Sequence, residues 1–417
     1  MRRVVITGLG MINSLGNNVS DSFDAIVEGK CGIDKISLFD ATEYSVQIAG
    51  EVKGFDPETV MDKKEVKKAD RFIHLGLKAS QEAIADCGLA DAEGKISDDI
   101  CDNFGIVSAS GIGGLSNIEK NSIICENQGP KRISPFFIPS ALVNMLGGFI
   151  SIAHKLRGPN LSVVTACAAG THAVGEAAKT IILGGADRML VVGAESAVCG
   201  AGVGGFASMK ALCTRNDEPQ RASRPFDAER SGFVMGEGAG ALVLEDLDTA
   251  LARGAKIYGE LIGFGESGDA NHITSPIVDG PFRAMSAAVK MAEKRIGKFK
   301  VDYVNAHGTS TPANDKNESA ALKMLFGGKE NCPPVSSTKG QTGHCLGAAG
   351  AIEAVICLKS MEKGIIPPTI NYENPDPDCD LDYVSEGARK AELDIVMSNS
   401  FGFGGTNGVL IFKKYNG

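Results

Sequence analysis

Short hydrophobic runs rich in β-branched residues recur along the chain, separated by longer stretches rich in alanine and glycine. The runs at 4–7 (VVIT), 161–164 (LSVV) and 188–194 (RMLVVGA) have the length of single strands. Runs of this kind are typical of strands buried on both faces, and the stretches between them favour packed helices. The pattern predicts an α/β fold whose first strand lies near the N-terminus.

A faint internal repeat divides this pattern into two halves. Residues 163–190 resemble residues 335–366 in their order of strand, polar turn and small-residue helix, and residues 236–246 (GEGAGALVLED) resemble 404–414 (GGTNGVLIFKK). The helices expected after Cys167 and from Gly347 are small on nearly every side, so other elements can enclose them. We therefore predict a duplicated, five-layered α-β-α-β-α architecture, with halves at residues 1–255 and 256–417.

Composition narrows the class of protein. The 417 residues are 43% hydrophobic and 22% charged, and no apolar run approaches the ~20 residues that span a bilayer, so we expect no membrane segment. Eleven cysteines without a CxxC spacing argue against a disulfide framework and a zinc site, and favour the reducing cytoplasm. A net charge of -9 makes nucleic-acid binding unexpected, although residues 62–71 (DKKEVKKADR) form a local basic run.

One cysteine, Cys167, follows the run LSVV directly, within the stretch TACAAGTH. A lone cysteine is usually inert core, but this one is expected at the start of a helix. There the unpaired N–H groups and the helix dipole stabilise a thiolate and lower the thiol pKa from about 8.5. Small neighbours also leave room for an acyl group. Cys167 is thus a candidate nucleophile, with a structural role as the alternative.

Two of the six histidines have a setting that suits catalysis. His307 ends a strand-like run in DYVNAHGTSTPAND, and His344 lies in SSTKGQTGHCLG, just before the second small-residue helix. A histidine in such a place can point into a cleft, where its N–H polarises a carbonyl group. The alternative is that both are loop histidines bonded to backbone. The remaining four are interpreted as packing, surface or structural residues: His74, His154, His172 and His272.

The glycine-rich stretch NSFGFGGTNG, from Asn399, allows the backbone to pass close to a reacting atom and to present N–H groups to an oxyanion. A nucleotide-binding loop is the competing interpretation. The sequence has no GxxxxGK[ST], and its best GxGxxG candidate, GLGMIN from Gly8, has Asn13 in place of the third glycine. Nucleotide binding is therefore not expected.

Taken together, TACAAGTH, NAHGTSTPAND, SSTKGQTGHCLGAAGAIE and NSFGFGGTNG resemble the β-ketoacyl-[acyl-carrier-protein] synthases of thiolase fold, most closely the elongating synthase II type. The resemblance extends from Val4 to Lys414. It implies decarboxylative Claisen condensation of an acyl group held on Cys167 with malonyl-acyl carrier protein, giving a 3-oxoacyl-carrier protein two carbons longer plus carbon dioxide, in fatty acid elongation. It implies no cofactor and no metal, since the 4′-phosphopantetheine of the carrier protein holds the substrates.

The resemblance also implies roles for individual catalytic residues. Cys167 is the acyl-accepting nucleophile, while His307 and His344 hold the malonyl thioester oxygen and stabilise the enolate. The N–H groups of Cys167 and Phe403 form the oxyanion hole, and Phe403 is in addition a gate. A charged pair supports the histidines: Lys339 and Glu353.

Further residues are implied to bind substrate. Thr309 and Thr311 match threonines that hold the pantetheine arm, and Phe401 is placed with the substrate-binding residues. Four residues match the acyl pocket, the last two reaching in from the other subunit of a homodimer: Ile112, Phe206, Phe137 and Ile138. Plain core roles for these four remain the alternative.

The pattern separates related classes of protein. Thiolases use a second cysteine late in the chain, and initiating synthases pair cysteine with His and Asn, whereas here two histidines occupy those roles. Chain-length factors lack the nucleophilic cysteine, so Cys167 argues against that non-catalytic class. Cys345, beside His344, is interpreted as core. Gly340–Gln341 and the small Ala169 depart from the family pattern but remove no catalytic group.

Acyl carrier protein is the implied partner, docked on a basic patch. Its residues recur at helical spacing and form one positive stripe if the segment is a helix: Lys63, Lys64, Lys67, Lys68 and Arg71, to which Lys210 is added from elsewhere in the chain. The alternative interpretation is a solvated face that binds no partner.

Overall fold

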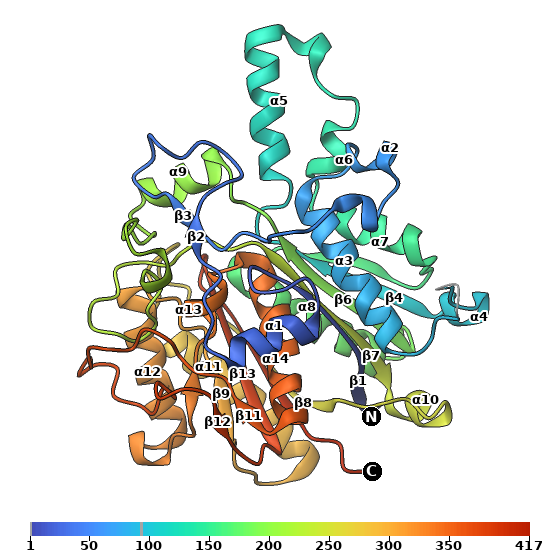
Figure 1. Cartoon of the computed structure of the whole chain (residues 1–417). Coiled ribbons are helices and arrows are strands. Elements are labelled where there is room, and N and C mark those ends of the chain that lie inside the picture. The colour runs from blue at the N-terminus through green and yellow to red at the C-terminus, as the bar shows by residue number, and fades with distance from the viewer. Residues whose placement is uncertain (1, 92–94) are drawn as a thin grey trace.

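The computed structural model describes residues 2–91 and 95–417. Its main sheet contains two sets of five strands (Figure 1). The N-terminal set is β1 (Val4–Ile12), β4 (Phe104–Ala109), β5 (Asn160–Val163), β6 (Arg188–Glu195) and β7 (Gly238–Asp246). The C-terminal set is β8 (Gly259–Gly268), β9 (Tyr303–Asn305), β10 (Val335–Ser336), β13 (Ile395–Gly402) and β14 (Thr406–Lys413). Two small ribbons pair β2 (Asp34–Lys35) with β3 (Ile48–Ala49) and β11 (Ile365–Ile366) with β12 (Arg389–Lys390).

The two sets of strands have the same topology. The order across the sheet is β10-β9-β13-β14-β8-β1-β7-β6-β4-β5, so each half reads third, second, fourth, fifth, first from its outer edge. In each half the first three of these strands are parallel, and the last two pairings are antiparallel. The halves join through β1 and β8 at Val5–Glu260 and Ile6–Gly259. This repetition confirms the predicted duplicated fold, while the boundary at residue 255 stays a prediction.

Helices complete five layers. α3 (Arg71–Asp86) and α7 (Met145–His154) cover the outer face of the N-terminal half, and α11 (Asp279–Ile296) and α12 (Pro312–Phe326) that of the C-terminal half. The central layer, between the two halves of the sheet, consists of α8 (Ala169–Ile182) and α14 (Ala349–Lys363). The remaining α-helices are α1 (Val19–Val27), α2 (Lys63–Val66), α4 (Asp98–Cys101), α5 (Leu115–Gln128), α6 (Phe137–Ala141), α9 (Gly200–Ser208), α10 (Leu247–Ala252) and α13 (Lys339–Thr342).

The two central helices are buried and touch backbone to backbone. A Cβ atom on Gly170 would lie 2.6 Å from the Ala351 nitrogen, and one on Gly350 would lie 2.5 Å from the Thr171 nitrogen. Real side chains do not fit at such distances, so glycine at both positions sets how closely α8 and α14 approach. The predicted burial of both small-residue helices is confirmed.

The basic run forms a short helix followed by a break. α2 ends at Val66, and the side chain of Asp70 accepts a hydrogen bond from the Phe72 N–H to cap a new helix, α3. The single helical stripe considered from the sequence is therefore not present. Among the helices of residues 2–91 and 95–417, none is long and apolar enough to cross a membrane.

Candidate active site

Cys167 lies at a tight turn between β5 and α8. It occupies the middle of a short 3-10 helix, Ala166–Ala168, which leads directly into α8. The preceding Ala166 has φ of 49°, in the left-handed region that a residue with a Cβ rarely adopts. This conformation turns the chain sharply, and the Cys167 side chain reaches a cavity of about 310 Å³. Strained backbone of this kind is common where a catalytic side chain must be held in place.

The thiol of Cys167 is not acidified as the sequence suggested. Burial raises the pKa of the Cys167 thiol to about 12, although the charge of Lys339 and a hydrogen bond from the Phe403 N–H both lower it. The helix-start position predicted a lowered pKa, and that prediction is wrong because loss of hydration outweighs the local dipoles. Burial therefore favours the protonated thiol at rest.

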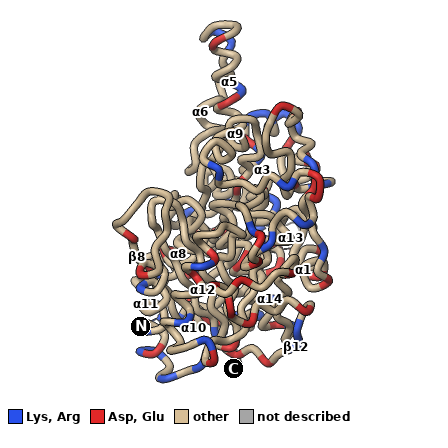
Figure 2. The backbone as a smooth tube through the Cα atoms, turned by 90° about the vertical axis from the view of Figure 1, so that its left-hand side faces the viewer, with Lys and Arg blue, Asp and Glu red and all other residues tan. Residues whose placement is uncertain are grey.

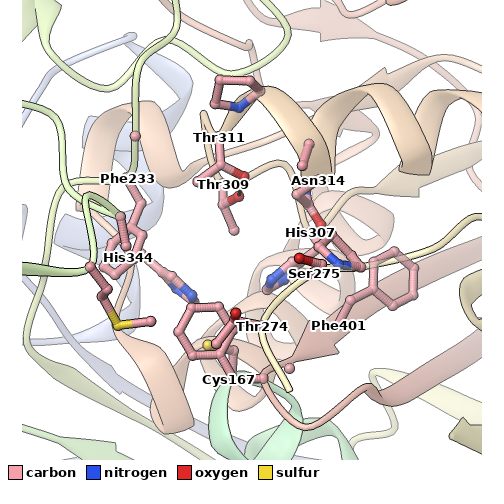
Figure 3. Close-up of a pocket in the computed structure, with 18 of the residues that line it drawn as sticks. Cys167, Phe233, Thr274, Ser275, His307, Thr309, Thr311, Asn314, His344 and Phe401 are labelled. Carbon is pink, nitrogen blue, oxygen red and sulfur yellow. Dashed lines mark hydrogen bonds between the residues drawn. The ribbon is translucent and has the colours of Figure 1, made fainter. Parts of the chain in front are cut away.

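His307 and His344 face the same cavity as Cys167. Figure 3 shows the three residues around one space, with the ring nitrogens of both histidines pointing toward its centre. The two imidazole centroids are 5.4 Å apart, with planes at 83°. Burial, together with the charge of Lys339, holds the pKa of each ring well below its usual range. Both imidazoles are thus neutral, and each has one N–H to donate.

The backbone around each histidine is fixed by hydrogen bonds. His307 follows β9, and its N–H donates to Glu318 of α12 at 2.9 Å, beside the N–H of Gly308 at 2.8 Å. His344 lies between α13 and α14, where its N–H donates to the carbonyl of Val234 at 2.7 Å. The backbone of both histidines is therefore fixed, and their rings line the cavity.

Lys339 and Glu353 form a buried ion pair behind the histidines. The Lys339 ammonium donates to the Glu353 carboxylate and, at 2.6 Å, to the backbone carbonyl of His307. Both side chains are buried, and burial raises the pKa of Glu353 to about 7. The pair thus ties α13 and α14 to the loop that carries His307.

The glycine-rich turn after β13 covers the cavity. Phe403, at 37% exposure, packs its ring 6.4 Å from that of Phe206, and Phe401 packs edge-on against His307 at 5.7 Å. The N–H of Gly404 donates to the carbonyl of Ile273 at 2.7 Å, so the 269–276 loop closes the same side. Thr309 and Thr311 line the wall opposite Cys167, with their hydroxyls 2.9 Å apart (Figure 3).

The four predicted acyl-pocket residues fall into two groups. Ile112 and Phe206 pack against the same apolar cluster as Cys167, and Phe206 also lines the cavity. Phe137 and Ile138 lie on α6, outside the cavity lining, and Ile138 is 57% exposed. Within one chain the structure therefore brings together two of the four.

The predicted docking residues also separate. The guanidinium of Arg71 makes two hydrogen bonds to the buried carboxylate of Glu237, at 2.8 and 2.6 Å, so Arg71 belongs to the scaffold rather than to an exposed patch. The Lys68 ammonium pairs with Glu65 at 2.5 Å. Three lysines of the run are exposed: Lys63, Lys64 and Lys67. Lys210, from another part of the chain, lies at the cavity mouth.

Sequence reasoning missed several residues of the site. Glu318 fixes the His307 loop, and Phe233 packs edge-on against His344 at 5.3 Å. Glu318 carries one signal, an acidic residue among small residues on a helix soon after His307. His272, for which the sequence favours a structural role, lines the cavity together with the residues that follow it up to Pro276. Across the described ranges, 2–91 and 95–417, no group of three or more His, Cys, Asp or Glu is arranged to hold a metal ion.

The duplicated α/β layers define a thiolase-like ketosynthase fold. The chain belongs to the β-ketoacyl synthase family: residues 1–250 match its N-terminal domain and residues 258–373 its C-terminal domain. It is 49% identical over 413 residues to the 3-oxoacyl-[acyl-carrier-protein] synthase 2 of Coxiella burnetii, covering 99% of both chains. It is 47% identical to that of a Synechocystis species, covering 99% of this chain and 98% of the relative.

Solved structures agree with this assignment. A β-ketoacyl synthase from Burkholderia phymatum superimposes with a TM-score of 0.91 at 35% identity, with 100% of both chains covered. A ketosynthase in complex with its type II polyketide acyl carrier protein superimposes with a TM-score of 0.88 at 32% identity, again over 100% of both chains.

Proposed function

We propose that this protein is a 3-oxoacyl-[acyl-carrier-protein] synthase of the synthase II type, which extends acyl chains by two carbons in fatty acid synthesis. The observation that carries the proposal is the convergence of Cys167, His307 and His344 on one cavity of about 310 Å³. Relatives that share 45 to 49% of the sequence over nearly the whole chain carry this activity in their names. A non-catalytic binding role is the alternative that the experiments below exclude or support.

The first half-reaction transfers the acyl group. The Cys167 sulfur attacks the thioester carbonyl of acyl-carrier protein, a new C–S bond forms, and the pantetheine C–S bond breaks. The thiol proton ends on the departing pantetheine sulfur. The N–H groups of Cys167 and Phe403 stabilise the oxyanion of the tetrahedral intermediate, since preorganised donors act strongly in a dry site.

The second half-reaction forms the new carbon–carbon bond. Malonyl-carrier protein replaces the first carrier, and its thioester oxygen accepts hydrogen bonds from His307 and His344. The carbon–carbon bond to the malonyl carboxylate breaks and carbon dioxide leaves. The electron pair of that bond stays on the remaining fragment and forms an enolate. The enolate carbon attacks the acyl carbonyl, and the Cys167 sulfur departs as a thiolate that takes a proton from water. Because both imidazoles are neutral, they donate to one oxygen without repelling each other.

Intact-protein mass spectrometry tests the proposal. After incubation with acyl-carrier protein, the wild-type chain should gain the acyl mass, and addition of malonyl-carrier protein should release carbon dioxide and a product two carbons longer. Cys167→Ser should gain no acyl mass and form no extended product, because an alcohol is not ionised enough to accept the acyl group at neutral pH. An adduct that persists on another cysteine of Cys167→Ser, or no adduct on the wild-type chain, would overturn it.

We also infer that acyl carrier protein docks on the basic segment next to α3. Lys63, Lys64 and Lys67 are exposed there, and Lys210 lies at the cavity mouth. One structural neighbour is a ketosynthase in complex with its acyl carrier protein. Acidic carrier proteins are steered by such charges on a protein of net charge -9. Cytoplasmic location, inferred from the cysteine pattern, remains part of the proposal.

A homodimer is the final element of the proposal. β5 lies at one edge of the main sheet, with Leu161 55% exposed, and α5 projects beyond the rest of the molecule (Figure 2). Beside α5, Ile138 on α6 is exposed as well. A free sheet edge with apolar neighbours favours pairing with another strand, and a second copy of the chain offers the same edge in return. Such a partner would cover Phe137 and Ile138.

Sedimentation measures this association. The wild-type chain should sediment as a dimer, and Leu161→Glu should shift it toward the monomer, because a charge is then buried in the interface. Met324→Glu, at an exposed position on α12 of the C-terminal half, is the matched control and should leave the dimer intact. A wild-type monomer would refute the dimer.

A further inference from the structure

A buried carboxylate whose charge helps to raise the pKa of the Cys167 thiol has no role in the reaction described so far. Glu195, the last residue of β6, is 0% exposed. It accepts four hydrogen bonds: from the Ser110 hydroxyl at 2.8 Å and from the N–H groups of Gly111 at 2.6 Å, Ile112 at 3.2 Å and Gly347 at 3.0 Å. Across the described residues no lysine, arginine or histidine forms an ion pair with it. Two segments, the turn at residues 110–112 and the turn at Gly347, therefore depend on one carboxylate.

One of the four donors belongs to a second copy of the nucleophile's turn. The short 3-10 helix Leu346–Ala348 leads into α14 as Ala166–Ala168 leads into α8. Leu346 has φ of 45°, close to the 49° of Ala166, so Gly347 occupies the position equivalent to Cys167. In the first turn the N–H of Cys167 is proposed to serve the oxyanion. In the second turn the equivalent N–H of Gly347 donates to Glu195.

Packing around the carboxylate leaves little freedom. A Cβ atom on Gly347 would lie 2.1 Å from the Gly111 nitrogen and 2.9 Å from a Glu195 oxygen, and one on Gly111 would lie 2.7 Å from that oxygen. Ile112, next in the chain, packs in the apolar cluster that includes Cys167 and Leu346. The position of Ile112 relative to the nucleophile is thus set through Glu195.

We propose that Glu195 is a positioning residue for acyl-chain selection: its carboxylate fills the anion-binding turn of the C-terminal half and from there fixes the Ser110–Ile112 turn, which carries the expected acyl-pocket residue Ile112 into the apolar cluster of Cys167. The inference rests on the proposed condensing function. It predicts that Glu195 acts on which acyl chains are accepted, and not on decarboxylation at the histidines.

Glu195→Gln is the main test. The amide keeps the shape but offers one acceptor oxygen and turns an NH₂ group toward N–H donors, so the turn loses part of its anchor. We expect the ratio of kcat/KM between the best and the poorest acyl chain length to fall by about fivefold, which corresponds to the free energy of one hydrogen bond. Decarboxylation of malonyl-carrier protein without an acyl primer should change little. Ser110→Ala removes one donor and should shift the profile in the same direction by less.

Glu245→Gln is the matched control. Glu245 is equally buried, bonded to Thr7, Arg188 and Arg253, and outside the cavity lining, so its loss should lower stability without changing the chain-length profile. A wild-type enzyme that does not condense would refute the proposed function. If the wild type condenses, an unchanged profile in Glu195→Gln, or a proportional loss at every length and in decarboxylation, overturns the inference. If Glu195→Gln does not fold, the profile of Ser110→Ala decides.

Discussion

Lys339→Met would remove the cation of the buried pair while keeping a side chain of similar length. The Glu353 carboxyl would then stay buried without its partner, and its pKa, already raised to about 7 by burial, would rise further. The lost hydrogen bond to the His307 carbonyl adds a pH-independent cost of about 2 kcal/mol, as expected for a charged donor. The remaining cost depends on pH because it comes from ionising Glu353.

The pH window follows from the sign of the shift. A carboxyl whose folded pKa exceeds its unfolded value, here 4.5, binds a proton more tightly when folded, so its stability contribution is lost as pH rises through the folded pKa. In the wild type the loss of stability from ionising Glu353 ends near pH 7. In the variant the same loss continues at higher pH, because the pKa of Glu353 is higher. Above pH 7, and up to the pKa of Glu353 in the variant, the variant should lose ~1.4 kcal/mol more than the wild type per pH unit.

Urea unfolding of both chains at several pH values measures this difference. Lys339→Met with Glu353→Gln should lose the extra pH dependence, because an amide does not ionise, and Glu353→Gln alone is the control that keeps the lysine. A stability difference that stays constant from pH 6 to pH 9 would refute the reasoning. The same substitution should raise the pKa of both histidines, since the Lys339 charge lowers them.

The other predictions concern separate steps. His307→Ala and His344→Ala should each retain acyl transfer but lose decarboxylation by ~10²-fold or more, measured as carbon dioxide release; equal loss of both steps would contradict the assignment. Ile112→Phe should shorten the longest acyl chain accepted, because added volume in a packed site is costly, and unchanged selectivity would make Ile112 plain core. Lys64→Glu with Lys67→Glu should raise KM for acyl-carrier substrates, most at low salt, and leave a small acyl thioester unaffected; if neither substrate responds, docking lies elsewhere.

The fold and three site residues, Cys167, His307 and His344, could be predicted from the sequence because their signals can be recognised along the chain. Strand-like runs, the internal repeat and the positions of Cys167 and His307 at element ends can all be read along the chain. The role of Arg71 could not be predicted, since its partner Glu237 is 166 residues away and meets it only in the folded sheet. The break after α2 did have a signal, Asp70, an N-cap residue directly before α3.

The raised thiol pKa could not be predicted for a different reason. A helix start lowers a thiol pKa through nearby N–H groups, which the sequence suggests, but burial raises it through atoms contributed by the whole fold. Cys167 is surrounded by elements from both halves, including Phe206 and Phe403. The net direction is therefore a property of the tertiary structure.

This direction leads to a final prediction about Cys167 at rest. A thiolate–imidazolium pair would hold the thiol pKa low and the histidine pKa high, whereas here burial raises the pKa of Cys167 to about 12 and lowers that of His307 and His344. Alkylation of Cys167 by iodoacetamide should thus accelerate about tenfold per pH unit from pH 7 to 10 without levelling, since the thiolate fraction rises in that proportion below the pKa. Peptide mass spectrometry follows the adduct, with Cys167→Ser as the background. A rate already constant at pH 7 would show that the thiolate is the resting form and that the N–H groups and Lys339 outweigh burial.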